Sequence, residues 1–296
     1  MKVLITGISG FVGSYLKELC IKNKDEVFGF DIKDGQDLLN YEQIRNFLDK
    51  VRPDEIYHLA AQAFVPESFN DPKRTFEVNV GGTINLLEAV KNLGLKPKIL
   101  ITGSSEEYGL VEFEECPIDE SQPLRPQSPY AISKVAQDFL GKWYADNYGL
   151  DIVRTRAFNH TGAGRPECYV TSSFAKQIAQ IEKYGGVLRH GNLDVIRDIT
   201  DVRDMVRAYR MAINLRPGVY NIGRGEGFQI KYILDTLKKM STKEIKTDLD
   251  KSRMRRTEVP ILICNSDKFR KLTKWKPEIK IKKTLSDMLN FWRERV

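Results

Sequence analysis

Short apolar runs alternate with amphipathic stretches over the first half of the chain. Runs typical of buried strands, each bounded by glycine or polar residues, cover residues 2–7, 26–32, 55–61, 97–105 and 151–158. Between these runs, apolar residues recur at helical spacing, which predicts helices over residues 14–23, 41–51, 76–94 and 128–149. Strands that alternate with helices form a parallel sheet covered on both faces. The pattern therefore predicts an α/β fold with a doubly wound parallel sheet.

The alternation breaks after about residue 157. A glycine-rich loop, "NHTGAGRPECY", follows, and helices expected at residues 172–185 and 200–214 bracket a short polar stretch. We predict that residues 1–156 form the sheet domain and that residues 198–216 return to it. The rest of residues 157–296 is expected to form a smaller C-terminal α/β domain that binds the substrate.

Composition excludes several classes of protein. No apolar run of the 296 residues approaches the ~20 that a membrane span needs, and the apolar start "MKVLITG" is too short and too interrupted for a signal peptide. The four cysteines form no CxxC pair and the three histidines no HExxH motif. We therefore expect reduced thiols, no metal site and a cytoplasmic location.

The positive charge is concentrated near the C-terminus. The chain carries a net charge of +7, and residues 231–296 hold 19 lysines and arginines against nine acidic residues. This region is either a solvated surface or one that attracts an anionic small molecule such as a nucleotide diphosphate. No nucleic-acid-binding motif accompanies it, so we expect neither a nucleic-acid nor a membrane partner.

Three glycines lie between the first expected strand and the first expected helix. Gly7, Gly10 and Gly13 have the spacing GxxGxxG in "TGISGFVGSYL". Glycine at such positions allows a tight turn, brings backbone N–H groups against a pyrophosphate, and lets the helix pack closely on the sheet. An ordinary tight turn is the alternative. The context favours dinucleotide binding and hence a Rossmann fold.

The second expected strand ends at Asp31, eighteen residues after Gly13. A carboxylate there can accept hydrogen bonds from the adenosine ribose and would repel a 2′-phosphate. We therefore expect NAD(H) to be preferred, with NADP(H) still accepted because Lys33 is nearby. The alternative is that Asp31 is only a turn residue.

Two further motifs suggest acid–base chemistry. Tyr130 and Lys134 in "SPYAISK" are four residues apart near a helix start, so they share one face. An ammonium group near a phenol lowers the pKa of the phenol towards the working range. In "ITGSSEEYG", two hydroxyls are followed by two carboxylates. That cluster is either a strand end at solvent or an acid–base site.

With these motifs the sequence resembles the extended short-chain dehydrogenases/reductases that act on nucleotide sugars. The resemblance covers nearly the whole chain, including "HLAA", "VNVGGTINLLEAV", "RDITDVRD" and "WKPEI". Within this family, "FNHTGAG", "SFAKQI" and "EVP" are most similar to the GDP-4-keto-6-deoxy-D-mannose reductases, and the GDP-mannose 4,6-dehydratases are the nearest alternative. The expected activity is NAD(P)H-dependent reduction of the 4-keto group of a GDP-4-keto-6-deoxyhexose.

The resemblance implies that Ser104, Tyr130 and Lys134 are catalytic. Glu106 stands where related dehydratases have their glutamate, so its presence leaves dehydration open. Three features favour a reductase: serine rather than threonine at position 104, "GF" in the glycine loop where mannose dehydratases tend to have Gln-Asp, and Asp31 in place of an arginine. Glu107 is interpreted as a solvated glutamate at a strand end.

The resemblance also implies binding residues and an assembly. Contacts with the cofactor are expected from Gly7, Gly10, Phe11, Val12, Gly13, Asp31, Asp37, Leu38, Leu59, Ala60, Ala61, Tyr130 and Lys134. Contacts with the GDP-sugar are expected from Ser105, Asn159, Lys176, Arg197, Arg255 and Glu258. A homodimer is expected through helices at residues 73–93 and 129–148, which carry surplus apolar residues such as Phe139, Trp143 and Tyr144. A non-enzymatic Rossmann protein is the remaining alternative, and the intact Tyr–Lys pair argues against it.

Overall fold

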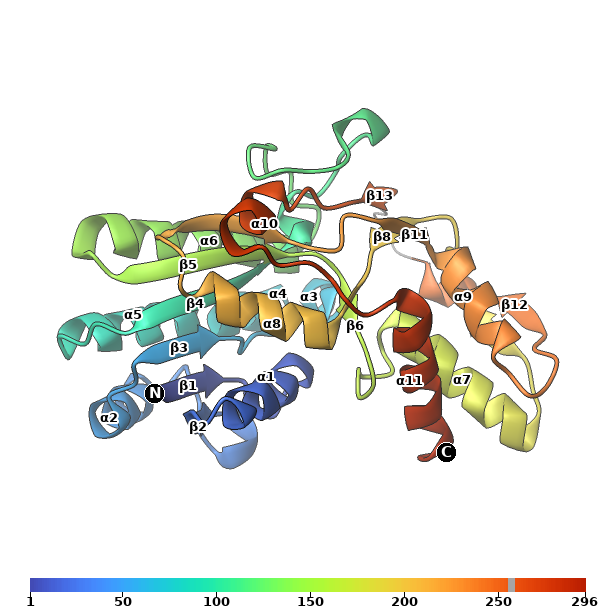
Figure 1. Cartoon of the computed structure of the whole chain (residues 1–296), viewed down its shortest axis with the longest axis horizontal. Coiled ribbons are helices and arrows are strands. Elements are labelled where there is room, and N and C mark those ends of the chain that lie inside the picture. Colours follow the sequence, from blue (N-terminus) through green and yellow to red (C-terminus); the bar gives the residue numbers. More distant parts are fainter. Residues whose placement is uncertain (255–258) are drawn as a thin grey trace.

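The computed structural model of the chain describes residues 1–254 and 259–296. Six parallel strands form the central sheet in the order β2-β1-β3-β4-β5-β10 (Figure 1). These strands are β1 (Lys2–Thr6), β2 (Glu26–Phe30), β3 (Glu55–His58), β4 (Lys98–Ser104), β5 (Asp151–Ala157) and β10 (Gly218–Ile222). Because β2 and β3 lie on opposite sides of β1, the loops after β1 and β3 diverge, which creates the crevice where such sheets bind ligands.

Helices cover both faces of this sheet, as the doubly wound prediction requires. One face packs against α1 (Phe11–Lys22), α8 (Val202–Ala212) and α10 (Asp267–Thr273). The other packs against α2 (Tyr41–Val51), α5 (Gly82–Asn92) and α6 (Pro129–Tyr148). Each face has its own buried hydrophobic core, so the fold class is confirmed.

A smaller α/β unit lies beside the carboxyl ends of the strands (Figure 1). Its core packs three helices together: α7 (Val170–Tyr184), α9 (Ile230–Lys239) and α11 (Ile281–Arg293). Its short strands are β6 (His160–Thr161), β7 (Leu188–His190), β8 (Ile196–Asp198), β9 (Thr200–Asp201), β11 (Gly227–Gln229), β12 (Thr247–Leu249) and β13 (Ile261–Leu262). They form three small sheets, β11-β8-β13, β12-β7 and β6-β9.

One domain assignment made from the sequence is wrong. Residues 218–222 were expected in the smaller domain, but they form β10 and pair with β5 at the edge of the main sheet. Phe269 and Trp275, later in the chain, pack into the same core as α8. Sequence periodicity could not reveal this because the strand has only five residues, too few for the pattern alone to assign it to either domain.

The predicted helix over residues 76–94 is also divided. It consists of α4 (Pro72–Phe76), a π-helical turn η2 (Glu77–Gly81) and α5. In the π turn, the Asn79 side chain accepts a hydrogen bond from the Gln62 backbone N–H at 2.8 Å and donates to Ser133 Oγ at 2.9 Å. π turns often occur at functional sites, and this one borders the start of α6.

The remaining elements are short. They are α3 (Val65–Asn70) and the 3₁₀ turns η1 (Ile32–Asp34), η3 (Ser105–Glu107), η4 (Phe113–Glu115) and η5 (Lys251–Arg253). Within the described residues, no helix is long and apolar enough to cross a bilayer. The four cysteines are free thiols, and the described part of the chain contains no group of three His, Cys, Asp or Glu side chains that could hold a metal ion.

Candidate active site

The carboxyl end of β4 carries Ser104, which is buried except for 9% of its surface. Directly after it, η3 turns the chain, and hydrogen bonds fix the serine on two sides. Ser104 Oγ accepts from the backbone N–H of Glu106 at 3.2 Å, and the backbone N–H of Ser104 donates to Glu107 Oε1 at 2.7 Å. These two hydrogen bonds hold the Ser104 hydroxyl at the carboxyl end of the sheet.

Helix α6 brings Tyr130 and Lys134 to the same place. Its first turn is capped by Ser128, whose hydroxyl accepts from the Ala131 N–H at 3.0 Å, and Pro129 starts the helix. Tyr130 hydrogen-bonds to the Ser104 side chain. Lys134 Nζ lies 5.9 Å from the centroid of the Tyr130 ring. The structure therefore brings the three predicted catalytic side chains together.

Burial determines the protonation of this group. Desolvation raises the pKa of Tyr130 above its usual value, and the bond with Ser104 only partly opposes this. The net shift is therefore upward: burial outweighs the lowering of the pKa that was expected from Lys134. Burial lowers the pKa of Lys134 to about 8, and its ammonium donates to Thr102 O at 2.9 Å and Gln137 Oε1 at 2.8 Å. Tyr130 thus keeps its proton at neutral pH.

The glycine loop forms a cradle that side chains would fill. Gly7 has φ +72°, and a Cβ there would lie 3.0 Å from the backbone of Ala60. A Cβ on Gly13 would lie only 2.2 Å from the Gly7 carbonyl oxygen. Gly10 caps α1, so the positive end of the helix faces the loop. This cradle fits the pyrophosphate of a dinucleotide.

Asp31 is bonded to this loop. Its carboxylate is 94% buried and accepts from the N–H of Ser9 at 2.8 Å and of Lys33 at 3.0 Å. Asp31 can therefore be a turn residue and also bind the adenosine ribose, because one carboxylate can accept several hydrogen bonds.

Some of the other predicted cofactor residues lie at the glycine loop and some do not. Ala60 packs against Gly7 of the loop, and its chain neighbours Leu59 and Ala61 belong to the same segment directly after β3. Phe11 and Val12 open α1 and pack on the core beneath it. Asp37 instead accepts the N–H of Leu39 at 2.9 Å, and Leu38 is buried against Gly82. The last two residues therefore stabilise the segment that follows η1.

A cleft of about 670 Å³ opens between the sheet edge and the smaller unit. Glu106, Asn159 and Arg197, all predicted from the sequence, line it. Ser105, the first residue of η3, is 97% buried and is absent from the lining. Lys176 also lies outside the lining: it pairs with Glu167 and sits over the Trp292 ring. The predicted substrate residues Arg255 and Glu258 lie outside the described residues.

The structure adds residues that the sequence did not single out. The Arg165 guanidinium stacks 3.6 Å from the Tyr169 ring centroid and 5.0 Å from that of Phe11. It thereby joins the cleft wall to the glycine loop. Burial lowers the pKa of His160 beside it to about 4, so this imidazole is neutral. The only sequence signal was their position in the glycine-rich loop "NHTGAGRPECY".

The sequence-based interpretation of Glu107 is wrong. It was expected to be solvated, but its surface is fully buried. Arg156 Nε lies 3.3 Å from Glu107 Oε2. Burial raises the pKa of the Glu107 carboxyl to about 8, against the opposing effect of Arg156.

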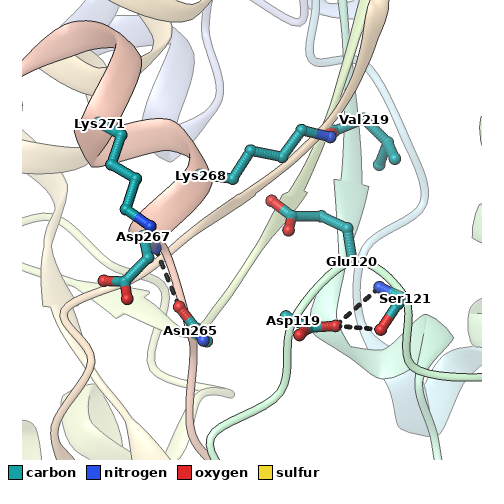
Figure 2. Close-up of a pocket in the computed structure, with 8 residues that line it drawn as sticks. All are labelled: Asp119, Glu120, Ser121, Val219, Asn265, Asp267, Lys268 and Lys271. Carbon is teal, nitrogen blue, oxygen red and sulfur yellow. Dashed lines mark hydrogen bonds between the residues drawn. The ribbon is translucent and has the colours of Figure 1, made fainter.

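A second, open hollow of about 710 Å³ lies at the far edge of the sheet, beside β10 and α10 (Figure 2). Several of its charged groups are engaged locally: Lys268 donates to Val219 O at 2.7 Å, and Glu120 accepts the Asn221 N–H at 2.7 Å. Asp119 bonds to Ser121 in the same turn. None of the predicted site residues lines this hollow, so the cleft is the candidate active site.

A Rossmann sheet that places a serine, a tyrosine and a lysine beside a glycine loop defines the class of short-chain dehydrogenases/reductases. A family model described as GDP-mannose 4,6 dehydratase matches residues 34–288, and the chain belongs to this family. The predicted family resemblance is therefore confirmed.

Individual relatives include enzymes of both predicted branches. The GDP-6-deoxy-D-mannose reductase of Pseudomonas aeruginosa is 34% identical, covering 100% of this chain and 98% of its own. A GDP-mannose 4,6-dehydratase of Vibrio cholerae is 32% identical over 83% of this chain and 72% of its own. The structure of RMD from Pseudomonas aeruginosa complexed with NADPH matches with a TM-score of 0.92 and 33% identity, covering 100% of this chain and 99% of that one. The UDP-glucose 4-epimerase of Thermus thermophilus, in complex with NAD, matches with a TM-score of 0.91 and 28% identity, with both chains fully covered.

Proposed function

We propose that this protein reduces the 4-keto group of a GDP-4-keto-6-deoxyhexose with a nicotinamide cofactor, as in the conversion of GDP-4-keto-6-deoxy-D-mannose to GDP-D-rhamnose. The observation that carries the proposal is the buried Ser104–Tyr130–Lys134 group. These three side chains do not line the substrate-sized cleft themselves, but Tyr130 interacts with Glu106, Arg165 and Tyr169, which do. The full-length similarity to a GDP-6-deoxy-D-mannose reductase supports this substrate.

Each member of the group has one task in this reaction. When bound, the cofactor supplies a hydride to C4 of the sugar. Tyr130 donates a proton to the 4-oxygen, for which its raised pKa suits it because the phenol stays protonated. Ser104 holds the same oxygen by a hydrogen bond, and the Lys134 ammonium stabilises the phenolate that remains.

The cradle of Gly7, Gly10 and Gly13 holds the pyrophosphate of the cofactor, and Asp31 binds its adenosine ribose. Asn159 and Arg197 in the cleft bind the GDP-sugar, the arginine through paired hydrogen bonds to the diphosphate. Ser105 is buried at the start of η3 and Lys176 pairs with Glu167, so we assign them no direct contact.

GDP-mannose 4,6-dehydratase activity is the second candidate, favoured by Glu106 in the cleft and by the family model. A dehydratase must remove a proton from C5, and a glutamate can serve as that base. In the proposed reductase, Glu106 only positions the substrate or Ser104. We therefore expect Glu106→Gln to lower kcat about tenfold or less on the 4-keto sugar.

The deciding assay compares two substrates. The wild-type enzyme is expected to oxidise NADH or NADPH with GDP-4-keto-6-deoxymannose, followed at 340 nm, and to leave GDP-mannose unchanged with catalytic NAD. Deuterium incorporation at C5 in D₂O is measured for wild type and Glu106→Gln. Conversion of GDP-mannose, or C5 exchange that disappears in the variant, would establish the dehydratase instead.

We also propose a homodimer, which the exposed apolar surface of α6 supports, and a cytoplasmic location, which the four free thiols support. Ile132, Phe139 and Trp143 are each about half exposed on this helix, while its small and polar residues face the sheet. Tyr144, predicted to join them, is buried and bonds to Glu88 at 2.7 Å. Covering such a surface with a second copy is the commonest solution. Light scattering at micromolar concentration should give twice the mass of 34.0 kDa; a monomeric mass would contradict the dimer.

A further inference from the structure

The two glutamates of η3 point to different environments. Glu106 lines the cleft, whereas Glu107 turns into the interior beneath Ser104. Its packing there is close: a Cβ on Gly103 would lie 2.3 Å from Glu107 Oε1. The same oxygen accepts the backbone N–H of Ser104 at 2.7 Å. Glu107 is therefore in direct contact with the strand end that carries the catalytic serine.

A capping role alone does not explain this burial. Glu107 completes a capping box with Ser104, but a solvated glutamate could accept the same N–H without the free-energy cost of losing its hydration. The ion pair with Arg156 offsets part of this cost. Asp138 pairs with both Arg156 (Nη2 to Oδ2, 2.6 Å) and Arg154 (Nη1 to Oδ1, 2.6 Å), so Asp138 and Glu107 together face two guanidinium groups.

Among the described residues, Glu107 is the carboxylate that acts on Lys134. The two oxygens that accept its hydrogen bonds belong to the Thr102 carbonyl and the Gln137 amide, which carry no charge. Lys134 Nζ is bonded to the carbonyl of Thr102, and Glu107 Oε1 packs against the next residue, Gly103, so both groups meet the same end of β4. From there the Glu107 carboxyl opposes the effect of burial on the pKa of Lys134. The charged and titratable groups facing Glu107 come from α6 and β5: Tyr130, Lys134, Asp138 and Arg156.

We propose that Glu107 is a positioning residue of this active site: its carboxylate fixes Ser104 through the backbone amide and favours the ammonium form of Lys134. The inference rests on the proposed function, because it requires proton donation by Tyr130. In that step the O–H bond of Tyr130 breaks, its proton joins the sugar 4-oxygen as the hydride reaches C4, and the phenolate faces the Lys134 ammonium.

The charge effect has a defined direction with pH. When Lys134 loses its proton, the phenolate is no longer stabilised, so kcat falls as pH rises through the pKa of Lys134. A nearby carboxylate raises that pKa, and its removal lowers it. Because its pKa is about 8, the Glu107 carboxyl is ionised over the alkaline limb. Glu107→Gln keeps the shape of the side chain and removes this charge. The alkaline limb of the kcat–pH profile should therefore move down by about one pH unit.

The profile is measured from pH 6 to 10 with saturating NADH or NADPH and GDP-4-keto-6-deoxymannose. Glu107→Asp keeps the charge but is too short to hold the Ser104 amide in the same place. It should therefore retain the wild-type limb while kcat falls severalfold. Glu55→Gln is the matched control, because Glu55 is a buried carboxylate paired with Arg210 and Tyr57 at the opposite end of the strands. Glu55→Gln should lower the stability of the protein and leave the alkaline limb of the kcat–pH profile at its wild-type position.

A second experiment measures the pKa of Lys134 in the absence of substrate. The ¹³Cε shift of Lys134, assigned by its loss in Lys134→Arg, is titrated in the wild type and in Glu107→Gln with the cofactor bound. If Glu107→Gln does not fold, Glu107→Met replaces it, since methionine buries no unpaired N–H. An unchanged alkaline limb, or a Lys134 titration at the wild-type pH, overturns the inference. Wild type that reduces no 4-keto sugar overturns the proposed function alone, because the titration still tests Glu107.

Discussion

Tyr130→Phe is expected to lower kcat for reduction of the 4-keto sugar by about 10²–10⁴-fold, the usual contribution of a positioned acid. The phenyl ring keeps the buried packing of Tyr130 but cannot donate a proton. Because the hydroxyl contributes little to substrate binding in the ground state, KM should change much less than kcat. Stopped-flow or steady-state oxidation of the cofactor at 340 nm measures both constants.

Tyr144→Phe is the matched control for this loss. Tyr144 is a buried tyrosine on the same helix, and its hydroxyl donates to Glu88 at 2.7 Å, away from the cleft. Its removal should cost about 1 kcal/mol of stability and leave kcat near the wild-type value. A Tyr130→Phe enzyme that keeps more than a tenth of the wild-type kcat would show that another group donates the proton.

Local sequence predicted the parts of the site that depend on local geometry. Gly7 and Gly13 could be identified because a tight strand–turn–helix requires glycine wherever the chain approaches itself. Tyr130 and Lys134 could be paired because four residues on a helix always bring side chains to one face. The strand that ends at Ser104 was visible as an apolar run. These features depend on distances along the chain, which a single sequence contains.

The features that the sequence missed depend on contacts between distant segments. Glu107 is buried because Arg156, on the neighbouring strand, lies opposite its carboxylate, and no pattern near residue 107 indicates this. The same is true of Arg165, whose guanidinium reaches Phe11 in the glycine loop. The pKa of Tyr130 was predicted from Lys134 alone, whereas the burial of the phenol dominates. Burial and pairing are properties of the assembled fold.

Asp31 provides the second large expected effect, on the choice of cofactor. Its carboxylate is 94% buried and already accepts two backbone N–H groups. The bonds to Ser9 and Lys33 hold it against the glycine loop, so it cannot move away from a ligand there. An added 2′-phosphate would place a second negative charge beside it in a poorly hydrated site. We therefore propose that the wild-type enzyme prefers NADH, although RMD from Pseudomonas aeruginosa was solved with NADPH.

Asp31→Asn and Asp31→Ala separate the charge of this residue from its structural role. Asparagine keeps an oxygen that accepts the Ser9 N–H, whereas alanine also loses this bond and loosens the loop. Both variants should shift the ratio of kcat/KM for NADH and NADPH at least tenfold towards NADPH, about 1.4 kcal/mol, because both remove the charge. Only Asp31→Ala should also raise KM for NADH. A wild-type enzyme that prefers NADPH tenfold or more would contradict the proposal, since the carboxylate would then face away from the 2′-position.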